Sequence, residues 1–182
     1  MFKRFSVAEH VSSQSKVKQS EQRRIRNAII EQYPTLAEGM DELLPKKELV
    51  VAKCQNHLNL ILSGASPLFF NVRDGPYFPT LRLLHQFPDM LPQMQIDAGG
   101  IRFIISGAHV MAPGLTSAGG KIADVAEGDV VAVMAEGKQH ALAVGIANFG
   151  ADAIREMKRG AAIDCVHCLN DDLWLIKEME GQ

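Results

Sequence analysis

The chain has 182 residues, of which 47% are hydrophobic and 22% are charged, with a formal net charge of −2. This composition excludes an intrinsically disordered chain, which needs low hydrophobicity and high net charge. It supplies enough apolar material for one large domain or two small ones. No apolar run approaches the roughly 20 residues of a membrane span. The charged first residues lack the apolar segment of a secretory signal. Three cysteines do not make a disulfide framework, so we expect reduced thiols, a cytoplasmic location and no membrane association.

The charge is distributed unevenly along the chain. Residues 1–30 carry seven basic and two acidic side chains, whereas residues 91–182 carry seven basic and twelve acidic ones. Whole-chain charge therefore gives no nucleic-acid signal, and the basic N-terminal cluster gives a weak one. A solvated helix face explains that cluster equally simply.

Two helices are predicted near the N-terminus. Apolar residues recur with helical spacing over 14–33, with Ile25 and Ile29 on the inner face. Pro34 stops this helix because it lacks an N–H group and restricts the residue before it. A shorter helix is expected over 35–44.

A β-rich stretch follows these helices. Apolar runs bounded by turn residues predict three strands: Leu49–Cys54, Leu58–Leu62 and Leu68–Val72. Thr80–His85 predicts a short helix, with Leu81 and Leu84 facing inward and Arg82 and His85 facing out.

The character of the chain changes after Pro88 and Pro92, which bracket a predicted domain boundary. Short strands then alternate with glycine-rich turns: Ile101–Ile105, His109–Met111, Val130–Ala135, Ala141–Ala147, Ile163–His167 and Asp172–Ile176. A helix over 151–159 interrupts them, with its inner face formed by Ala153, Ile154 and Met157. Six short strands with one helix favour a small mixed-strand barrel over a βαβ unit.

No segment of the sequence predicts catalysis. A phosphate-binding loop needs Gly-Lys-Ser/Thr, but Gly120-Lys121 is followed by Ile122 and the glycine spacing is wrong by one. Adjacent strand carboxylates such as Asp171 and Asp172 face opposite ways and make poor acid–base partners. We therefore expect a protein that is not an enzyme and needs no cofactor.

Cysteine and histidine lie close together in Cys165, His167 and Cys168. If these residues form a strand, Cys165 and His167 share one face and Cys168 points to the other. One metal ion could not easily bind both sulfur atoms. A buried thiol beside a strand histidine is the preferred interpretation, and no metal site is predicted.

Several segments, taken in order along the chain, closely resemble the malignant T-cell-amplified sequence 1 family. They are Met1–Phe5, Met40–Lys47, Gly75–Pro88, Ser106–Ser117, Val133–Leu142 and Leu169–Trp174. The resemblance covers essentially the whole chain, and the combination is highly specific. The residues of Gly107-Ala108, Val110-Met111 and Pro113-Gly114 alone match a general PUA signature.

The resemblance implies an α+β protein with an N-terminal mixed α/β domain, over residues 1–90, and a C-terminal PUA-type pseudo-barrel, over residues 91–182. It also implies a non-catalytic RNA-binding translation factor that acts on the 40S ribosomal subunit with a partner like the density-regulated protein. The expected roles are release of deacylated tRNA in subunit recycling, reinitiation and non-standard recruitment of initiator tRNA.

Physical arguments select candidate RNA contacts within the PUA part. Glycines in the signature permit positive φ or close backbone approach, and an unpaired RNA end such as the tRNA acceptor end is gripped by stacking and edge contacts. The candidates are Gly107, Ala108, Met111, Pro113, Gly114, Leu115, Lys121, Lys138 and His140. Met111 and Leu115 can equally belong to the core. The acidic balance of this half predicts weak RNA binding without a partner.

Arginine and aromatic residues suggest a second surface, for the ribosome or a protein partner. The candidates are Arg23, Arg24, Arg26, Arg73, Tyr77, Phe78, Arg82 and His85. Packing of Tyr77 and Phe78 between the two domains is the alternative. Two other functions stay open: an RNA-modification accessory protein that binds tRNA or rRNA through its PUA domain, and a protein-interaction adaptor in signalling.

Overall fold

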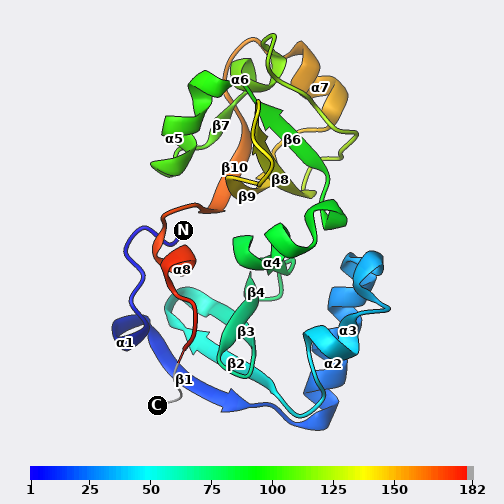
Figure 1. Cartoon of the computed structure of the whole chain (residues 1–182), viewed down its shortest axis with the longest axis vertical. Coiled ribbons are helices and arrows are strands. Elements are labelled where there is room, and N and C mark those ends of the chain that lie inside the picture. The colour runs from blue at the N-terminus through cyan, green and yellow to red at the C-terminus, as the bar shows by residue number, and fades with distance from the viewer. Residues whose placement is uncertain (180–182) are drawn as a thin grey trace. The chain divides into compact units, whose positions relative to one another are not determined.

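The computed structural model describes residues 1–179 of the chain as two compact units, neither of which is continuous in sequence. Unit 1 comprises Met1–Arg4 and Leu81–Leu175, and unit 2 comprises Phe5–Thr80 and the segment that begins at Ile176. Figure 1 shows their elements in chain order. The first four residues therefore belong with the C-terminal half of the chain.

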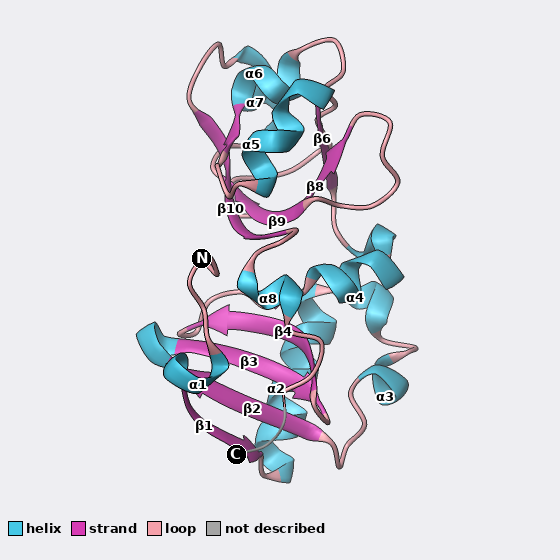
Figure 2. Cartoon of the chain, turned by 60° about the vertical axis from the view of Figure 1, so that its left-hand side comes forward, coloured by secondary structure: helices cyan, strands magenta, loops and turns pink. Residues whose placement is uncertain are grey.

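Unit 2 is built on an antiparallel sheet in which sequence neighbours pair, in the order β1-β2-β3-β4-β5 (Figure 2). The strands are β1 (Val11–Lys16), β2 (Leu49–Cys54), β3 (Leu58–Ser63), β4 (Ser66–Val72) and β5 (Phe78–Pro79). Continuous apolar runs in β2 and β3 are buried on both faces, as their composition requires. The three strands predicted in this region are confirmed.

Helix α2 (Gln19–Gln32) covers part of one face of this sheet. Its Ile25 and Ile29 are buried, as their spacing predicts, and the ring of Tyr33 stacks on Phe69 of β4 at 6.3 Å. The shorter elements are α1 (Val7–His10), the 3₁₀ turns η1 (Pro34–Leu36) and η2 (Gln55–His57), and α3 (Met40–Leu43).

Two helix boundaries predicted in unit 2 are wrong. Residues 14–16 were expected in the long helix but end β1, where pairing with β2 overrides their local preference. The helix expected over 35–44 is two short pieces, because η1 begins at Pro34 and turns separate it from α3.

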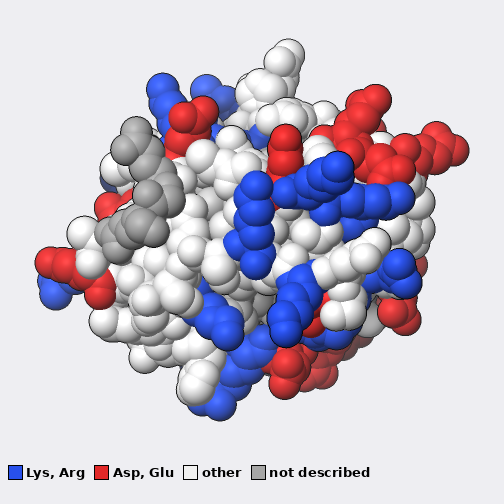
Figure 3. All heavy atoms as spheres, turned by 90° about the horizontal axis from the view of Figure 1, so that it is seen from below, with Lys and Arg blue, Asp and Glu red and all other residues white. Residues whose placement is uncertain are grey.

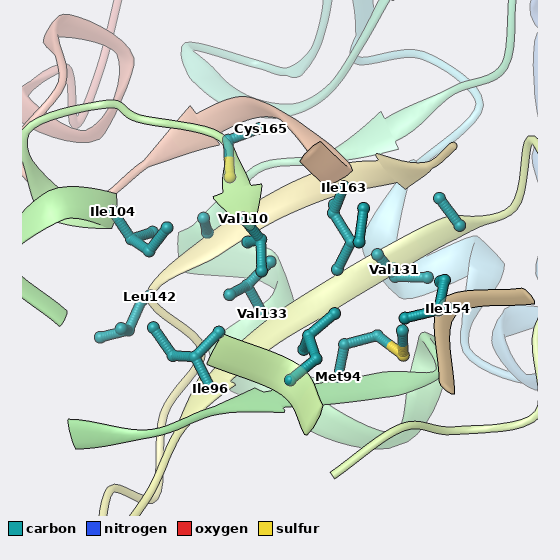
Figure 4. Packing of buried hydrophobic residues seen from close by; sticks show 14 of the residues in the cluster. Met94, Ile96, Ile104, Val110, Val131, Val133, Leu142, Ile154, Ile163 and Cys165 are labelled. Atoms are coloured by element: carbon teal, nitrogen blue, oxygen red, sulfur yellow. The ribbon is translucent and has the colours of Figure 1, made fainter. Parts of the chain in front are cut away.

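Unit 1 contains a curled sheet in the order β6-β8-β9-β10-β7. The strands are β6 (Gln93–Ile96), β8 (Val130–Ala135), β9 (Ala143–Ala147), β10 (Ala161–Cys168) and β7 (Val110–Met111). β6 runs parallel to β8 and the other pairs are antiparallel, so the sheet is mixed, as the sequence predicts. Its core comprises β-branched and aliphatic side chains, including Val131, Val133, Ile154 and Ile163 (Figure 4).

Short helices precede, connect and follow the strands of unit 1. They are α4 (Leu81–Gln86), η3 (Pro88–Met90), η4 (Ala98–Gly100), α5 (Ile101–Ile105), α6 (Ala112–Thr116), α7 (Ala151–Glu156) and α8 (Asp172–Leu175). Leu81 and Leu84 of α4 are buried, as predicted.

Three predictions in unit 1 are wrong. Ile101–Ile105 was expected as a strand but forms α5, which continues from η4, a turn that Asp97 caps by accepting a hydrogen bond from Gly100 N at 3.1 Å. Asp172–Ile176 was expected as a strand but begins with α8. In α7, Ile154 is buried and Met157 half-buried, but Ala153 is exposed.

Candidate nucleic-acid interface

The PUA signature forms a turn between α5 and β7 that depends on Gly107. This residue has φ +85°, in the left-handed region that favours glycine. Its N–H donates to the Ile104 carbonyl at 2.8 Å, and Ala108 N donates to the Phe103 carbonyl at 2.9 Å. These bonds end α5 and direct the chain into β7. Gly107 and Ala108 are both half-buried, so the backbone of the turn is partly accessible.

Helix α6 is fixed to the end of β6 through Asp97. The backbone N–H of Asp97 donates to the Gly114 carbonyl at 3.0 Å, and Asp97 Oδ2 accepts a hydrogen bond from Ser117 Oγ at 2.8 Å. Pro113 is exposed in the first turn of α6, where its missing N–H has no cost. Gly120 passes so close that an added Cβ would lie 2.1 Å from the Leu115 carbonyl oxygen. The segment 107–121 is therefore a rigid support.

Two large apolar side chains are exposed on either side of the Gly107 turn, one on α5 and one on β7. Phe103 is 52% exposed and Met111 is 51% exposed. The guanidinium of Arg102 lies over the Phe103 ring, 4.7 Å from its centroid. Exposed aromatic and thioether groups beside an arginine are suited to stacking on a nucleic-acid base.

Leu115 takes the core role that the sequence left open, because only 2% of it is exposed. Its side chain packs in the core of unit 1 and is not available to a ligand in this structure. Arg102 and Phe103 are candidates that the sequence analysis missed. Treating their segment as a strand hid them, although an arginine–aromatic pair shortly before Gly107 was a usable signal.

The three predicted polar contacts of this half are all exposed. Lys121 is held by reciprocal backbone hydrogen bonds with Gln95, both at 2.9 Å, which leave its side chain free to point outward. Lys138 follows Gly137, whose φ of +72° makes the turn after β8. The ring of His140 lies 5.0 Å from that of His85. All three are placed where charge or hydrogen bonds can be offered to a ligand.

The proposed arginine face of α2 is reduced by internal pairing. Arg23 is exposed, and Arg24 makes two hydrogen bonds to Glu21, at 2.9 and 2.6 Å. The prediction that Arg26 belongs to this face is wrong. Only 11% of its side chain is exposed, and it binds Asp41 and the Leu44 carbonyl. It therefore fastens α2 to α3 and does not belong to a free basic face.

The prediction that Tyr77 and Phe78 form a surface for the ribosome or a partner is also wrong. Tyr77 is 8% exposed and Phe78 is 4% exposed, and Phe78 stacks on Phe70 at 5.1 Å. Phe78 packs on Phe70, and Tyr77 contacts Gln32 and Tyr33, all within unit 2, so the two residues are not an exposed contact surface for a partner. Arg73 is exposed, with φ +55°.

Arg82 and His85 do not face freely outward as expected. The Arg82 guanidinium lies 4.4 Å from the centroid of Trp174, and its Nη2 donates to the Trp174 carbonyl at 2.7 Å. The His85 ring contacts Trp174 and lies 2.9 Å, through Nε2, from the Ala141 carbonyl. Burial is the main cause of the lowered pKa of His85. The two side chains join α4 to α8 and to Ala141, just before β9, within unit 1.

The cysteine–histidine cluster has the chemistry of a protein interior. Burial raises the pKa of Cys165 to about 12 and that of Cys54 to about 11, so these thiols stay protonated. His167 Nδ1 lies 2.7 Å from Asp171 Oδ2. A bulge in β10 between Cys165 and His167 breaks the simple alternation assumed from sequence. Within residues 1–179, no three histidine, cysteine or acidic residues are arranged to hold a metal ion.

Within the same residues, no helix has the length and apolar character to cross a bilayer.

Comparison with known proteins agrees with this geometry. The model of the Pre-PUA-like domain matches residues 5–88, and that of the PUA domain matches residues 92–169. A crystal structure of a hypothetical protein from Pyrococcus horikoshii is similar, with a TM-score of 0.72 and 26% identity, over 90% of this chain and 99% of that one. The fold and its glycine-supported surface thus define an RNA-binding PUA-domain protein, and the expected α+β architecture with a PUA pseudo-barrel is confirmed.

Two relatives identify the family. The chain is 44% identical to malignant T-cell-amplified sequence 1-A of Xenopus laevis, over 97% of this chain and 98% of the relative. It is 46% identical to the Drosophila melanogaster malignant T-cell-amplified sequence 1 homolog, over 99% of this chain and 100% of the relative. The chain therefore belongs to the malignant T-cell-amplified sequence family, as its motifs predict.

Proposed function

We propose that this protein is a non-catalytic translation factor that acts on the 40S ribosomal subunit in the cytoplasm, with a protein partner similar to density-regulated protein. In this role it binds the unpaired acceptor end of tRNA. It promotes release of deacylated tRNA during recycling, reinitiation and non-standard recruitment of initiator tRNA. Family membership supports the translational role, and the surface of unit 1 supports the RNA contact.

The exposure of Phe103 and Met111 carries the RNA part of the proposal. Each side chain is about half exposed, although its neighbour in sequence is buried. Ile104 follows Phe103, and Val110 precedes Met111. A base stacked on such a side chain is worth about 1–3 kcal/mol, whatever its sequence. The partly accessible backbone around Gly107 offers amide and carbonyl groups to the ribose and phosphate beside it.

Charge sets the expected strength of this contact. Phosphate neutralisation supplies much of RNA affinity, and the exposed cations that we assign to this surface are Arg102, Lys121 and Lys138. Three cations make few phosphate contacts. We therefore expect weak binding of free RNA and much tighter retention when the ribosome or a partner adds contacts.

Sucrose-gradient sedimentation with purified 40S subunits and deacylated tRNA tests the proposal. The wild-type protein should co-migrate with 40S and alter tRNA retention. A Phe103→Asp/Met111→Asp variant should co-migrate but fail to act on the tRNA, whereas Phe149→Asp, at a residue 41% exposed elsewhere in unit 1, should behave as wild type.

Two outcomes would contradict the proposal. A wild-type protein that stays at the top of the gradient is not a 40S factor. Co-migration with a modified RNA substrate but not with 40S would favour the RNA-modification accessory role instead.

A further inference from the structure

Unit 2 contains a groove of about 820 Å³ that none of the RNA contacts above uses. It lies between one side of α2, from Ser20 to Gln32, and one face of the sheet, and the end of β1 closes one side. We call it the α2 groove. Figure 3 views the end of the molecule that carries β1 and the start of α2, and shows lysine and arginine side chains gathered over the middle of that face.

The floor of the α2 groove is polar at one end and apolar at the other. Lys53, Asn59 and Asn71 lie side by side across β2, β3 and β4. Asn59 Nδ2 donates to Asn71 Oδ1 at 3.2 Å, and Asn71 Nδ2 donates to the Arg73 carbonyl at 3.0 Å. An amide group offers two donors and an acceptor with two lone pairs, so the half-buried Asn59 keeps capacity for a ligand, whereas Asn71 is buried and orients it.

The apolar end of the α2 groove follows from the strand period. Val51 pairs with Ile61, two residues along from Lys53 and Asn59, so both share the face of the polar row. Ile25 of α2 lines the same end. These three side chains are buried, so the apolar surface that an occupant would meet includes the half-buried Val17 and Ala28.

The rim of the α2 groove is predominantly basic. Five cations line it, against the two carboxylates Glu21 and Asp74: Lys16, Lys18, Arg24, Lys53 and Arg73. Glu21 is bound by Arg24, and the other four cations are exposed. The excess of positive charge selects an anionic occupant.

A second hollow of about 440 Å³ extends the α2 groove and shares Lys53, Asn59, Arg73 and Asp74 with it. Asn56, His57 and Arg73 line this hollow and have φ of 58°, 60° and 55°. Left-handed conformations are uncommon for residues other than glycine and cost of order 1 kcal/mol or more each. Strain of this kind gathers at functional sites when the side chains are needed there.

We propose that the α2 groove and its extension bind an extended, acidic peptide segment of a partner protein. The half-buried amide of Asn59 suits a peptide backbone, the half-buried Val17 and Ala28 suit one apolar side chain, and the cations suit carboxylates. Single-stranded RNA would need exposed rings for stacking. Among the described residues that line the α2 groove, the aromatic residue is Tyr77, only 8% exposed.

The inference rests on the proposed function in one respect, that the protein works with a protein partner. The RNA surface of unit 1 shares no residue with the α2 groove. Loss of either activity is therefore measured separately, by peptide binding for the groove and by 40S and tRNA retention for the proposed function.

Selection from a library of 12-residue peptides tests the proposal, using the full chain as bait and removing peptides that also bind a Lys53→Glu/Arg73→Glu variant. The enriched peptides should be rich in aspartate and glutamate and carry one apolar residue. The charge-reversed variant should bind them about tenfold or more weakly, whereas Lys158→Glu/Arg159→Glu, exposed in unit 1, should bind as wild type.

Arg73→Gly separates binding from folding. Removal of the left-handed strain at φ 55° should raise the urea midpoint, yet the enriched peptides should bind more weakly. Amide shifts in NMR spectra should map to β2, β3 and β4 next to α2.

Three results would overturn the inference. They are enrichment of neutral or basic peptides, no enrichment over the variant, or an oligo(U) RNA that binds the α2 groove more tightly than the peptides and loses that binding in Lys53→Glu/Arg73→Glu.

Discussion

At the scale of single residues, neighbours on one short segment have opposite roles. Met111 is 51% exposed and Leu115, one helical turn further on, is 2% exposed. The same segment needs glycine at two positions for different reasons: Gly107 for its positive φ and Gly120 for the space beside Leu115. Exposure and backbone geometry, and not hydrophobicity alone, separate contact residues from supporting ones.

Alanine substitutions at three glycines should destabilise the protein in a defined order. Gly120→Ala should cost most, because its Cβ would lie 2.1 Å from a backbone oxygen. Gly107→Ala should cost about 1 kcal/mol, since φ is positive but the nearest group is the flexible Lys3 side chain. Gly114→Ala is the control, with the nearest atom 3.9 Å away. Urea unfolding measures all three, and an equal effect at each position would contradict this account.

His85 should make stability depend on pH. Its pKa is lowered from 6.5, chiefly by burial, with His140, Arg82 and His167 adding repulsion. The unfolded chain therefore takes up a proton at higher pH than the folded chain, and the stability due to neutral His85 is lost as pH falls below about 6.5. His85→Gln should lose less stability than wild type between pH 7.5 and 5.5. Identical losses in urea unfolding would rule this out.

At the scale of elements, Asp171 organises the end of β10 and the start of α8. One carboxylate oxygen lies 2.7 Å from His167 Nδ1 and accepts from Cys168 N at 2.9 Å, and the other accepts from Trp174 N at 2.9 Å. Burial raises the pKa of Asp171, but these hydrogen bonds, led by that with His167, bring it below its usual value. The carboxylate so stabilises a helix in place of the predicted strand.

Replacement of Asp171 should therefore disrupt this junction. Asp171→Ala leaves buried donors unpaired and should cost about 3 kcal/mol. Trp174 is the single tryptophan, so its fluorescence should shift in the folded variant. The contribution of Asp171 is present above pH 3.8 and is lost as pH falls through its lower folded pKa. Asp152→Asn, at a side chain 99% exposed, should have little effect; a loss as large as that of Asp171→Ala would show that the effect is not specific.

Elements with continuous apolar runs could be predicted from sequence, and polar or capped ones could not. β2 and β8 are buried along nearly their whole length, so their apolar composition alone predicts them as strands. β1 is polar and is a strand only because it pairs with β2. α5 has a β-branched composition but starts from a turn capped by Asp97.

The same contrast holds for the candidate site. The glycines and the exposed lysines of the PUA part were identified from local signals that survive in the structure. Arg26 and Phe78 were misassigned because their partners, Asp41 and Phe70, lie on other elements whose packing the local sequence pattern does not show. Arg102 and Phe103 were missed because a helix turned them outward.

At the scale of the whole molecule, charge is divided unevenly between the two proposed binding surfaces. The acidic half carries the proposed RNA surface, and the basic residues near the N-terminus contribute Lys16, Lys18 and Arg24 to the α2 groove. The RNA contact should therefore depend little on long-range charge.

Salt dependence measures that division. Binding of a single-stranded RNA with a tRNA-like 3′ end should weaken only moderately with salt, because each phosphate contact adds about −0.7 to the log–log slope. Lys121→Gln/Lys138→Gln should flatten the slope by about 1.4 if both contact phosphate, and Lys158→Gln should leave it unchanged. Fluorescence anisotropy from low to physiological salt is the measurement. An unchanged slope in the double variant would remove these lysines from the surface.

The location of the first residues has a consequence during synthesis. Phe2 is 1% exposed, its ring meets the edge of His167, and its carbonyl accepts from Asp172 N at 3.1 Å. A nascent chain cannot make these contacts until β10 and α8 have left the ribosome tunnel. Unit 1 must then close over contacts between the two ends of the chain, the kind of non-local pairing that slows folding. The segment around Phe2 therefore lacks its native contacts with His167 and Asp172 until those residues have been synthesised.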